Sequence, residues 1–534
     1  MSAQTLCRTP SSDEVTACGL TREDPTQPSQ LAVQPPELPL ARRLLIMGSI
    51  VGTQVIQMSA FSAGISASFV VPQILGHDNV ASAPWVAASY PLAQAAFILP
   101  GGRLGTIYGH HNLLFIGCFL WVALTIGSAF SPNFVTLCAL RGASGIGGGI
   151  MVPNAVALLT ITFPPGRMRN IGIGLFGAAA PFGAAAGGVI IDLLLQFAEW
   201  KWCFIFLAIL GAVVFIAAFL AAERDKPLDP DGKIDFVGAY LGMAALFLFK
   251  FVWNQAPAVG WQTAYEIVLL VLSIVHGVAF CVWEAKFASE PIVPFNIGTR
   301  PSFSALVATV LLSLMGFGIY VYYFFLWQFS ARHYTLTAMG GALGPFALVS
   351  IIMAFVSALL VAIMKIQYIL GLGVVSLIIA CLLVATMPDQ QVYWAQAFPS
   401  SFFAGAGPDL LITAAQVIAS SSVRRSEQGV AGSLIGVLQV YGLSTGLGFA
   451  GTVEVHVNKH GADPVLGYRG GMFLALGFLG LAFIINLFYV RMPADTQVGW
   501  REDDLKVRRE GEDGEATTVD ASSEKEEKKG DLSV

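Results

Sequence analysis

The sequence predicts an all-α integral membrane protein with fourteen transmembrane helices and with both termini in the cytosol. Three observations carry this prediction. Hydrophobic residues make up 55% of the 534-residue chain and charged residues only 12%, whereas soluble domains carry about 25% charged residues. Apolar runs of about 20 residues, long enough to span a bilayer, recur along the chain. Lysine and arginine gather on alternate loops between these runs, which is the positive-inside bias of membrane proteins.

Fourteen apolar runs divide the chain into two sets of six helices and an inserted pair. The longest of the loops expected in the cytosol bracket the seventh and eighth runs. This arrangement predicts an N-terminal six-helix bundle over 44–222, an inserted helix pair with its flanking cytosolic loops over 223–300, and a C-terminal six-helix bundle over 301–491. In such a repeat a substrate cavity lies near the midplane between the bundles. The runs lie near 44–71, 84–104, 112–130, 134–158, 170–191, 202–222, 235–254, 264–284, 301–328, 340–364, 366–387, 393–420, 429–453 and 471–490.

The basic residues between the runs test this count. Fourteen of them fall on loops that would face the cytosol and four on outer loops. A missed or extra helix would exchange the cytosolic and outer loops in the part of the chain that follows it, and the ratio would be lost. The observed bias therefore supports an even number of spans. The cytosolic set is Arg42, Arg43, Arg103, Arg167, Arg169, Arg224, Lys226, Lys233, Lys286, Arg300, Lys365, Arg424, Arg425 and Arg491, and the outer set is Lys201, Arg332, Lys459 and Arg469.

The two ends of the chain are polar and carry the net charge. Residues 1–40 hold six of the 27 prolines and no early apolar run, which argues against a signal peptide. Residues 501–534 contain 7 basic and 12 acidic residues and so account for the whole formal net charge of −5. We expect residues 1–43 and the acidic residues 492–534 to be disordered cytosolic tails. The rest of the chain is neutral, which excludes a basic nucleic-acid surface.

The sequence lacks the patterns of an enzyme or a metalloprotein. None of the seven cysteines forms a CxxC pair, so neither a zinc site nor a disulfide framework is indicated. No Gly-x-x-x-x-Gly-Lys-Ser/Thr loop occurs, which argues against ATP hydrolysis on this chain. We therefore expect no metal, no cofactor and no enzymatic activity, and either an ion gradient or simple facilitation as the driving force.

A glycine-rich segment that ends in two histidines follows the second run. Glycines three or four apart at a helix end allow two backbones to approach closely. The segment resembles the signature of the major facilitator superfamily, in which a Gly, an acidic residue, a Gly and a basic pair lock the inward gate. Thr106 stands at the acidic position, so the resemblance implies a weakened or titratable charge lock; a turn with two solvated histidines is the alternative. The expected gate loop comprises Gly102, Arg103, Gly105, Thr106, Gly109, His110 and His111.

Two further runs carry partial signatures of the same superfamily. In the fourth run, Arg141 followed by Gly145 resembles a signature associated with proton transfer. An arginine within an apolar span is costly unless it faces a partner or water; the alternative is snorkelling to the outer surface. The fifth run resembles the antiporter signature of drug exporters in part, since Asp192 stands where a glycine is expected. Generic packing of small residues is the alternative there. The residues of this antiporter-like motif in the fifth run are Gly174, Pro181, Gly183, Gly187 and Gly188.

Shorter segments extend the resemblance over about residues 44–491. Trp200–Phe204 and Ser426–Leu434 look like segments of the fourteen-span drug:proton antiporter family, and Asn254–Pro257 is similar to its fungal aminotriazole-resistance-like branch. The resemblance implies the major facilitator fold, with two six-helix bundles and two inserted helices. It also implies a multi-pass protein of the plasma membrane, with the vacuolar membrane as the alternative.

Asp409 is the most informative single residue. It lies inside the twelfth run, directly after Pro408 and far from either loop. A carboxylate at that depth marks a functional site by default, and the twelfth helix is the counterpart of the helix that bears Arg141. We expect Asp409 and Arg141 to serve proton coupling or substrate binding. The alternative is a structural aspartate that bonds the backbone freed by Pro408.

Three other features remain open. Lys250 lies inside the seventh run, where snorkelling to the surface explains it best. The aromatic run from Tyr320 to Trp327 fits an interfacial belt, with a ring or two turned towards a cavity. His456 and His460 are spaced like metal ligands but fall in a loop, so we expect them to be solvated.

The resemblance, together with Asp409 and Arg141, implies a secondary active transporter, with proton-coupled efflux of small organic toxins, drugs or metabolites by alternating access. Its partners would be a small-molecule substrate, protons and the lipid bilayer, with no nucleic acid, and we expect a monomer. The altered signatures keep a second hypothesis open, a low-affinity carrier of a small inorganic solute such as ammonium or borate. A transporter-like membrane sensor is a third hypothesis, which the short, low-complexity C-terminal tail disfavours.

Overall fold

The computed structural model describes residues 39–77, 79–163, 167–222, 224–225, 227, 229–288, 290–292, 301–422, 428–458 and 462–491. Within them every regular element is a helix, which confirms the all-α prediction. Residues 1–43 and 44–534 are two separate units, and the description below concerns the second. The tails expected to be disordered, 1–43 and 492–534, lie outside the described residues except for 39–43.

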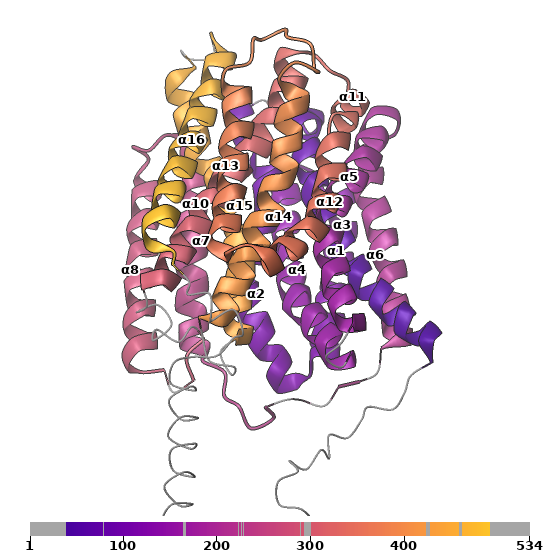
Figure 1. The fold of residues 1–534 in the computed structure, drawn as a ribbon. Coiled ribbons are helices and arrows are strands. Elements are labelled where there is room, and N and C mark those ends of the chain that lie inside the picture. Colours follow the sequence, from indigo (N-terminus) through magenta and orange to yellow (C-terminus); the bar gives the residue numbers. More distant parts are fainter. Residues whose placement is uncertain are drawn as a thin grey trace, which may run out of the picture. The chain divides into compact units, whose positions relative to one another are not determined.

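Fourteen helices of 20 or more residues lie in the described part of the chain (Figure 1). Thirteen segments are long and apolar enough to cross a membrane. The remaining long helix, α2, is less apolar because its last turns hold glycines and Arg103. The helices are α1 (Leu40–Ile74), α2 (Trp85–Tyr108), α3 (His110–Ala129), α4 (Phe134–Thr162), α5 (Arg167–Phe197), α6 (Lys201–Ala221), α7 (Phe236–Val259), α8 (Ala264–Lys286), α10 (Pro301–Leu326), α12 (Gly344–Ile363), α13 (Ile366–Ala385), α14 (Ala397–Ser421), α15 (Gln428–Val457) and α16 (Pro464–Tyr489).

Two segments differ from the expected boundaries. Helix α2 continues to Tyr108, and only Gly109, with a φ of 91°, separates it from α3. The expected gate loop is therefore mostly helical, because a single residue with positive φ suffices for the turn. The tenth run is divided into the short helix α11 (Leu336–Gly341) and α12. Two single turns complete the described elements, η2 (Val80–Ser82) and the π-helical η3 (Trp327–Ala331).

The long helices form two groups, which we call the first half (α1 to α6) and the second half (α10 to α16). In the first half α4 packs against α2 and α3, and α3 packs against α6. In the second half α10 packs against α15 and α16, and α13 packs against α14 and α16. The halves meet along α2 and α15, and again where α5 contacts α11 and α12. These two contact lines leave room between the halves for a cavity.

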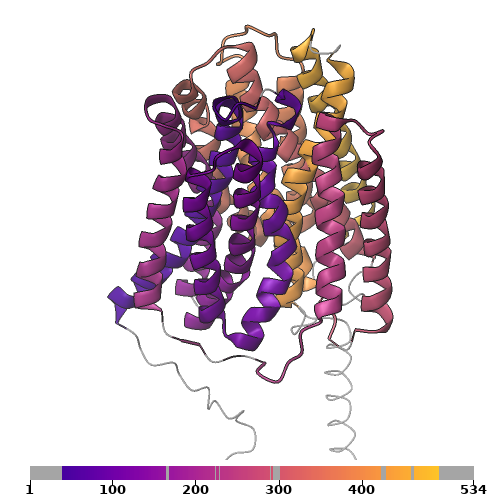
Figure 2. The ribbon, with the colours of Figure 1, turned by 180° about the vertical axis from the view of Figure 1, so that it is seen from behind.

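The inserted pair stands beside the two halves. Helix α7 packs against α8 and also against α2 and α15, so it covers the line where the halves meet (Figure 2). Helix α8 packs mainly against α7 and exposes many apolar side chains, as expected for a helix that faces lipid. Lys250 of α7 is fully buried, with its Nζ 5.8 Å from the centre of the Tyr441 ring. The expectation that Lys250 snorkels to the surface is therefore wrong.

Candidate functional site

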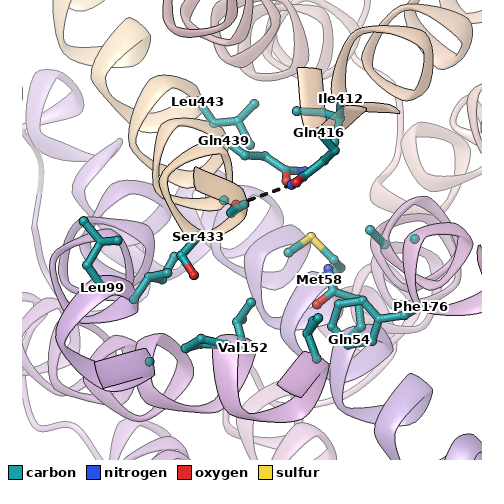
Figure 3. A pocket seen from close by; sticks show the side chains of 18 of the residues that line it. Gln54, Met58, Leu99, Val152, Phe176, Ile412, Gln416, Ser433, Gln439 and Leu443 are labelled. Carbon is teal, nitrogen blue, oxygen red and sulfur yellow. Dashed lines mark hydrogen bonds between the residues drawn. The ribbon is translucent and has the colours of Figure 1, made fainter. Parts of the chain in front are cut away.

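A cavity of about 1950 Å³ lies between the two halves. Helices α1, α2, α4 and α5 of the first half and α10, α12, α14 and α15 of the second half supply most of its walls. Figure 3 shows side chains of the two halves facing each other across it. Those labelled are Gln54, Met58, Leu99, Val152 and Phe176 from the first half, and Ile412, Gln416, Ser433, Gln439 and Leu443 from the second.

The cavity reaches one face of the molecule. Its lining includes Arg103 at the end of α2, Arg169 at the start of α5, and Glu290, which follows α8. The side chains of Arg103 and Glu290 are 29% and 42% exposed, so the cavity extends to the surface there. We call this side the basic face, because Arg103, Arg169 and Lys286 lie at its helix ends and Lys233 lies in the segment before α7. On the opposite face α5 is in contact with α11 and α12, and no residue of α11 lines the cavity, which indicates that the cavity is closed there.

Asp409 lines the cavity from α14, as does Thr413 one turn further along the same helix. The Asp409 side chain is half-buried beside Ser350 of α12, and its Oδ2 has no hydrogen-bond partner among the described residues. The other charged lining residues of the described chain lie near the basic face. Asp409 is thus the carboxylate that faces the deep part of the cavity, where it is available to a proton or to a cationic group.

Amides and aromatic rings complete the lining. Gln54 of α1 lies opposite Gln416 of α14 (Figure 3), and the Gln416 Nε2 donates to the backbone oxygen of Gly432 at 3.5 Å. Tyr320 and Phe324 also line the cavity, which confirms that part of the aromatic run faces inwards. Sequence reasoning missed the glutamines, although uncharged amides in apolar runs are a signal of the same kind as Asp409.

The histidines of the expected gate are buried at the start of α3. Asp225, from the segment between α6 and α7, accepts hydrogen bonds from the backbone N–H of His110 at 2.8 Å and of His111 at 2.9 Å. The Nδ1 of His110 lies 2.8 Å from the Oδ1 of Asn154 on α4. Both histidines are only 4% exposed, so the alternative of two solvated histidines is wrong. Asp225 instead caps α3, at the helix end where a negative charge is favourable.

The rest of the gate segment is tied to the flanks of the inserted pair. Arg103 forms ion pairs with Asp229, at 3.0 Å, and with Glu290. The Thr106 Oγ1 donates to the backbone oxygen of Arg103 at 2.7 Å, and its own backbone oxygen accepts from the N–H of Asp229 at 3.0 Å. Gly102 lies against Pro153 of α4 and Gly105 against Asn154. The acidic residues that Thr106 cannot supply thus come from segments distant in the sequence, which the local motif could not reveal.

The glycines of α5 serve two different purposes. Gly183 and Gly187 lie against α1, where an added Cβ would overlap the backbone of Val55 and the side chain of Ser59. Gly188 faces Ser62, also of α1, and a Cβ added to Gly188 would lie 2.7 Å from the Ser62 hydroxyl oxygen. Gly174 has open space around it, and it lines the cavity together with Pro181. One stretch of α5 therefore packs tightly on α1, while another borders the cavity.

Arg141 does not line the cavity. Its Nε donates to the backbone oxygen of Val86 at 2.8 Å and its Nη2 to that of Ala60 at 3.3 Å. The guanidinium also lies 5.5 Å from the centre of the Phe204 ring. Arg141 is only 3% exposed, so it links α1, α2, α4 and α6 inside the first half and does not snorkel. The structure does not bring Arg141 and Asp409 together.

Two halves of membrane-spanning helices around a central cavity define a multi-pass integral membrane protein of the transporter type. Residues 55–449 match the family model described as Major Facilitator Superfamily. The chain belongs to this superfamily, and similar fungal proteins place it in the aminotriazole-resistance-like branch.

Three fungal relatives illustrate the range of this branch. The chain is 31% identical to a low affinity ammonium transporter of Saccharomyces cerevisiae, over 83% of this chain and 87% of the relative. It is 31% identical to the efflux pump terJ of Aspergillus terreus, over 85% and 90% of the two chains. It is 30% identical to the aminotriazole resistance protein of Saccharomyces cerevisiae, over 77% of each chain.

The fold also matches solved transporter structures. A POT family transporter in complex with 5-aminolevulinic acid aligns with a TM-score of 0.63, over 83% of this chain and 96% of that chain. Their sequences are only 14% identical, so this likeness concerns the fold alone.

Proposed function

We propose that this protein is a proton-coupled exporter of small organic toxins, drugs or metabolites that works by alternating access. The observation that carries the proposal is the cavity, which presents the carboxylate of Asp409 among amides and aromatic rings. An apolar wall with a few polar groups is typical of sites for small organic molecules. A carboxyl group in such a wall can exchange one bound proton for a substrate.

The orientation follows from the basic residues. We assign the basic face to the cytosol, because lysine and arginine favour the cytosolic side of membrane proteins. The cavity seen here then faces the cytosol, ready to receive a substrate. In the proposed cycle, substrate enters as Asp409 releases a proton to the cytosol. The halves then rock about the cavity, the substrate leaves outside, and a proton from outside binds Asp409 before the return step.

An ammonium carrier is the second candidate, because one of the similar proteins is a low affinity ammonium transporter. Ammonium is about as large as one water molecule, which occupies about 30 Å³ of the liquid. The cavity of about 1950 Å³ is far larger than such an ion requires. Its size and aromatic lining favour the organic substrate. The plasma membrane is the proposed location. For Arg141, which bonds to backbone oxygens of α1 and α2, we propose support of the first half during rocking in place of the proton-coupling or substrate-binding role expected from the sequence.

Transport in inside-out vesicles separates the two candidates. The vesicles carry the wild type, Asp409→Asn or the control Asp389→Asn, which alters an exposed carboxylate on the opposite face. With an acidic lumen, we expect the wild type and Asp389→Asn to accumulate aminotriazole or the organic cation ethidium. The initial rate of uptake by Asp409→Asn should be at least about tenfold lower, which corresponds to roughly 1.4 kcal/mol of activation free energy. Uptake of the ammonium analogue methylammonium, without uptake of aminotriazole or ethidium, would support the ammonium carrier and contradict export of drug-like organic molecules.

A further inference from the structure

The cavity ends at a contact between the two halves on the face opposite the basic face. The ring centres of Phe69 and Tyr322 lie 5.7 Å apart, and those of Phe69 and Phe329 lie 5.4 Å apart. The backbone N–H of Thr337 donates to the Oε1 of Gln196 at 3.0 Å. Helix α11 lies beside the end of α5 at this contact (Figure 1). We call it the outer seal, formed by Phe69, Asp192, Gln196, Tyr322, Phe329, Thr337 and Gly340.

A carboxylate is buried inside the outer seal. Asp192 of α5 is 1% exposed and does not line the cavity. Its Oδ2 faces Gly340 of α11, where an added Cβ would approach the oxygen within 2.7 Å. Ser66 of α1 is its hydroxyl neighbour, and its Oδ1 has no hydrogen-bond partner among the described residues. The transport cycle proposed above makes no use of this group.

Among the described residues, no positively charged side chain pairs with Asp192. Helix α1 presents the hydroxyl of Ser66, α11 presents Gly340, and α6 presents the titratable thiol of Cys203. The Cys203 Sγ donates to the backbone oxygen of Ile191 at 3.8 Å. None of the ion pairs found in the described chain includes Asp192. A buried carboxylate without a counter-charge is costly, whereas a protonated carboxyl group is not. The closed seal therefore fits a protonated Asp192.

We propose that Asp192 is a second proton-binding group, separate from Asp409, which must be protonated before the outer seal closes. When the halves part on this face, α5 leaves α11 and the Asp192 carboxyl group meets water and releases its proton. A proton from the same side must bind again before α5 and α11 can pack. Because this proton enters and leaves on one side, it adds nothing to the protons coupled to substrate. The inference rests on the alternating access proposed for the cavity.

Distances across the outer seal test this proposal without a transport assay. Spin labels are attached at Phe197→Cys, on the exposed end of α5, and at Ala338→Cys, on the exposed side of α11. Serine replaces Cys7, Cys18, the partly exposed Cys138 and the exposed Cys281, so that the native cysteines left in place are the buried Cys118, Cys203 and Cys381. The distance distribution is measured in lipid nanodiscs by electron paramagnetic resonance between pH 5.5 and 8.5.

We expect the fraction with a closed seal in the wild type to grow as the pH falls. Asp192→Asn cannot ionise, so its seal should stay closed at every pH. At pH 8 its closed-to-open ratio should exceed that of the wild type at least about tenfold, a difference of roughly 1.4 kcal/mol. Asp192→Glu should restore the pH dependence. Asp389→Asn, which alters an exposed carboxylate on the same face, should behave as the wild type. If Asp192→Asn is poorly folded, Asp192→Ser removes the same charge and should give the same result.

Two results would overturn the proposal. The first is a wild-type distribution that does not change with pH, and the second is a pH dependence that survives in Asp192→Asn. The Asp409→Asn variant separates the two proposals, because it should retain the response of the seal to pH through Asp192. Loss of coupling in Asp409→Asn together with an unaltered seal in Asp192→Asn would reject the second proton-binding group and leave the proposed export intact.

Discussion

At the residue scale, scarce charge within the apolar runs identified the unusual positions but not their surroundings. Asp409 faces the cavity, whereas Arg141 bonds to backbone oxygens inside the first half. Both residues looked alike in the sequence, because an apolar run does not show which way each side chain points. The rotation of a helix is set by packing with partners that are distant in the chain.

Lys250 provides a test of buried charge. Its Nζ is fully buried and has no hydrogen-bond partner among the described residues. It lies over the face of the Tyr441 ring, whose centre is 5.8 Å away. Lys250→Met keeps the length of the side chain and removes an uncompensated amine, so we expect it to stabilise the protein by about 1 kcal/mol or more. The melting temperature in detergent measures the change, with Lys286→Met at the exposed end of α8 as the control. A lower melting temperature for Lys250→Met alone would show that the amine has a partner.

At the element scale, glycine spacing predicted close helix packing but not which glycines take part in it. Gly183, Gly187 and Gly188 lie against α1, whereas Gly174 of the same motif borders the cavity. The gate segment shows a similar limit. Its glycines and histidines are local, but Asp225, Asp229 and Glu290, which bind it, come from other segments.

The two kinds of glycine in α5 make a matched pair. An added Cβ at Gly187 would overlap the Ser59 side chain, so we expect Gly187→Ala to destabilise the protein by about 1–3 kcal/mol. Gly174→Ala meets nothing within 4 Å and should stabilise the helix by about 0.5–1 kcal/mol. Thermal unfolding of the purified variants measures both effects. Equal melting temperatures for the two variants would contradict the packing of α5 on α1.

The cap of α3 is testable by backbone exchange. Asp225 accepts from the N–H groups of both His110 and His111, so Asp225→Ala should destabilise the first turn of α3 by about 1 kcal/mol. Hydrogen–deuterium exchange of a peptide that begins several residues before His110 and includes the N–H groups of His110 and His111 should then become faster. Asp229→Ala is the control, because Asp229 forms an exposed ion pair with Arg103, and such pairs contribute little. Unchanged exchange in Asp225→Ala would remove Asp225 from the cap.

At the scale of the whole molecule, most of the fold followed from the sequence and most of the site did not. Fourteen helices were predictable because a membrane span needs a long apolar run, and each run is a local property. The cavity depends on how eight helices from two halves meet, which no run reveals by itself. Asp409 was found because a carboxylate is conspicuous at that depth, whereas Gln54 and Gln416 were overlooked.

Asp409 is proposed to couple a proton to substrate movement, which is a different role from helping the substrate to cross the membrane. Proteoliposomes separate the two roles. They are loaded with unlabelled ethidium and diluted into a trace of labelled ethidium without a pH gradient, so that exchange reports crossing alone. The same preparations, with an acidic lumen and transporters whose basic face points outwards, then report accumulation driven by protons.

We expect Asp409→Asn to retain exchange within about twofold of the wild type and to lose the accumulation driven by the pH gradient, since an amide cannot carry a proton. Asp409→Glu should recover part of the accumulation, because it restores the carboxyl group. Full gradient-driven accumulation in Asp409→Asn, with exchange equal to the wild type, would contradict the account.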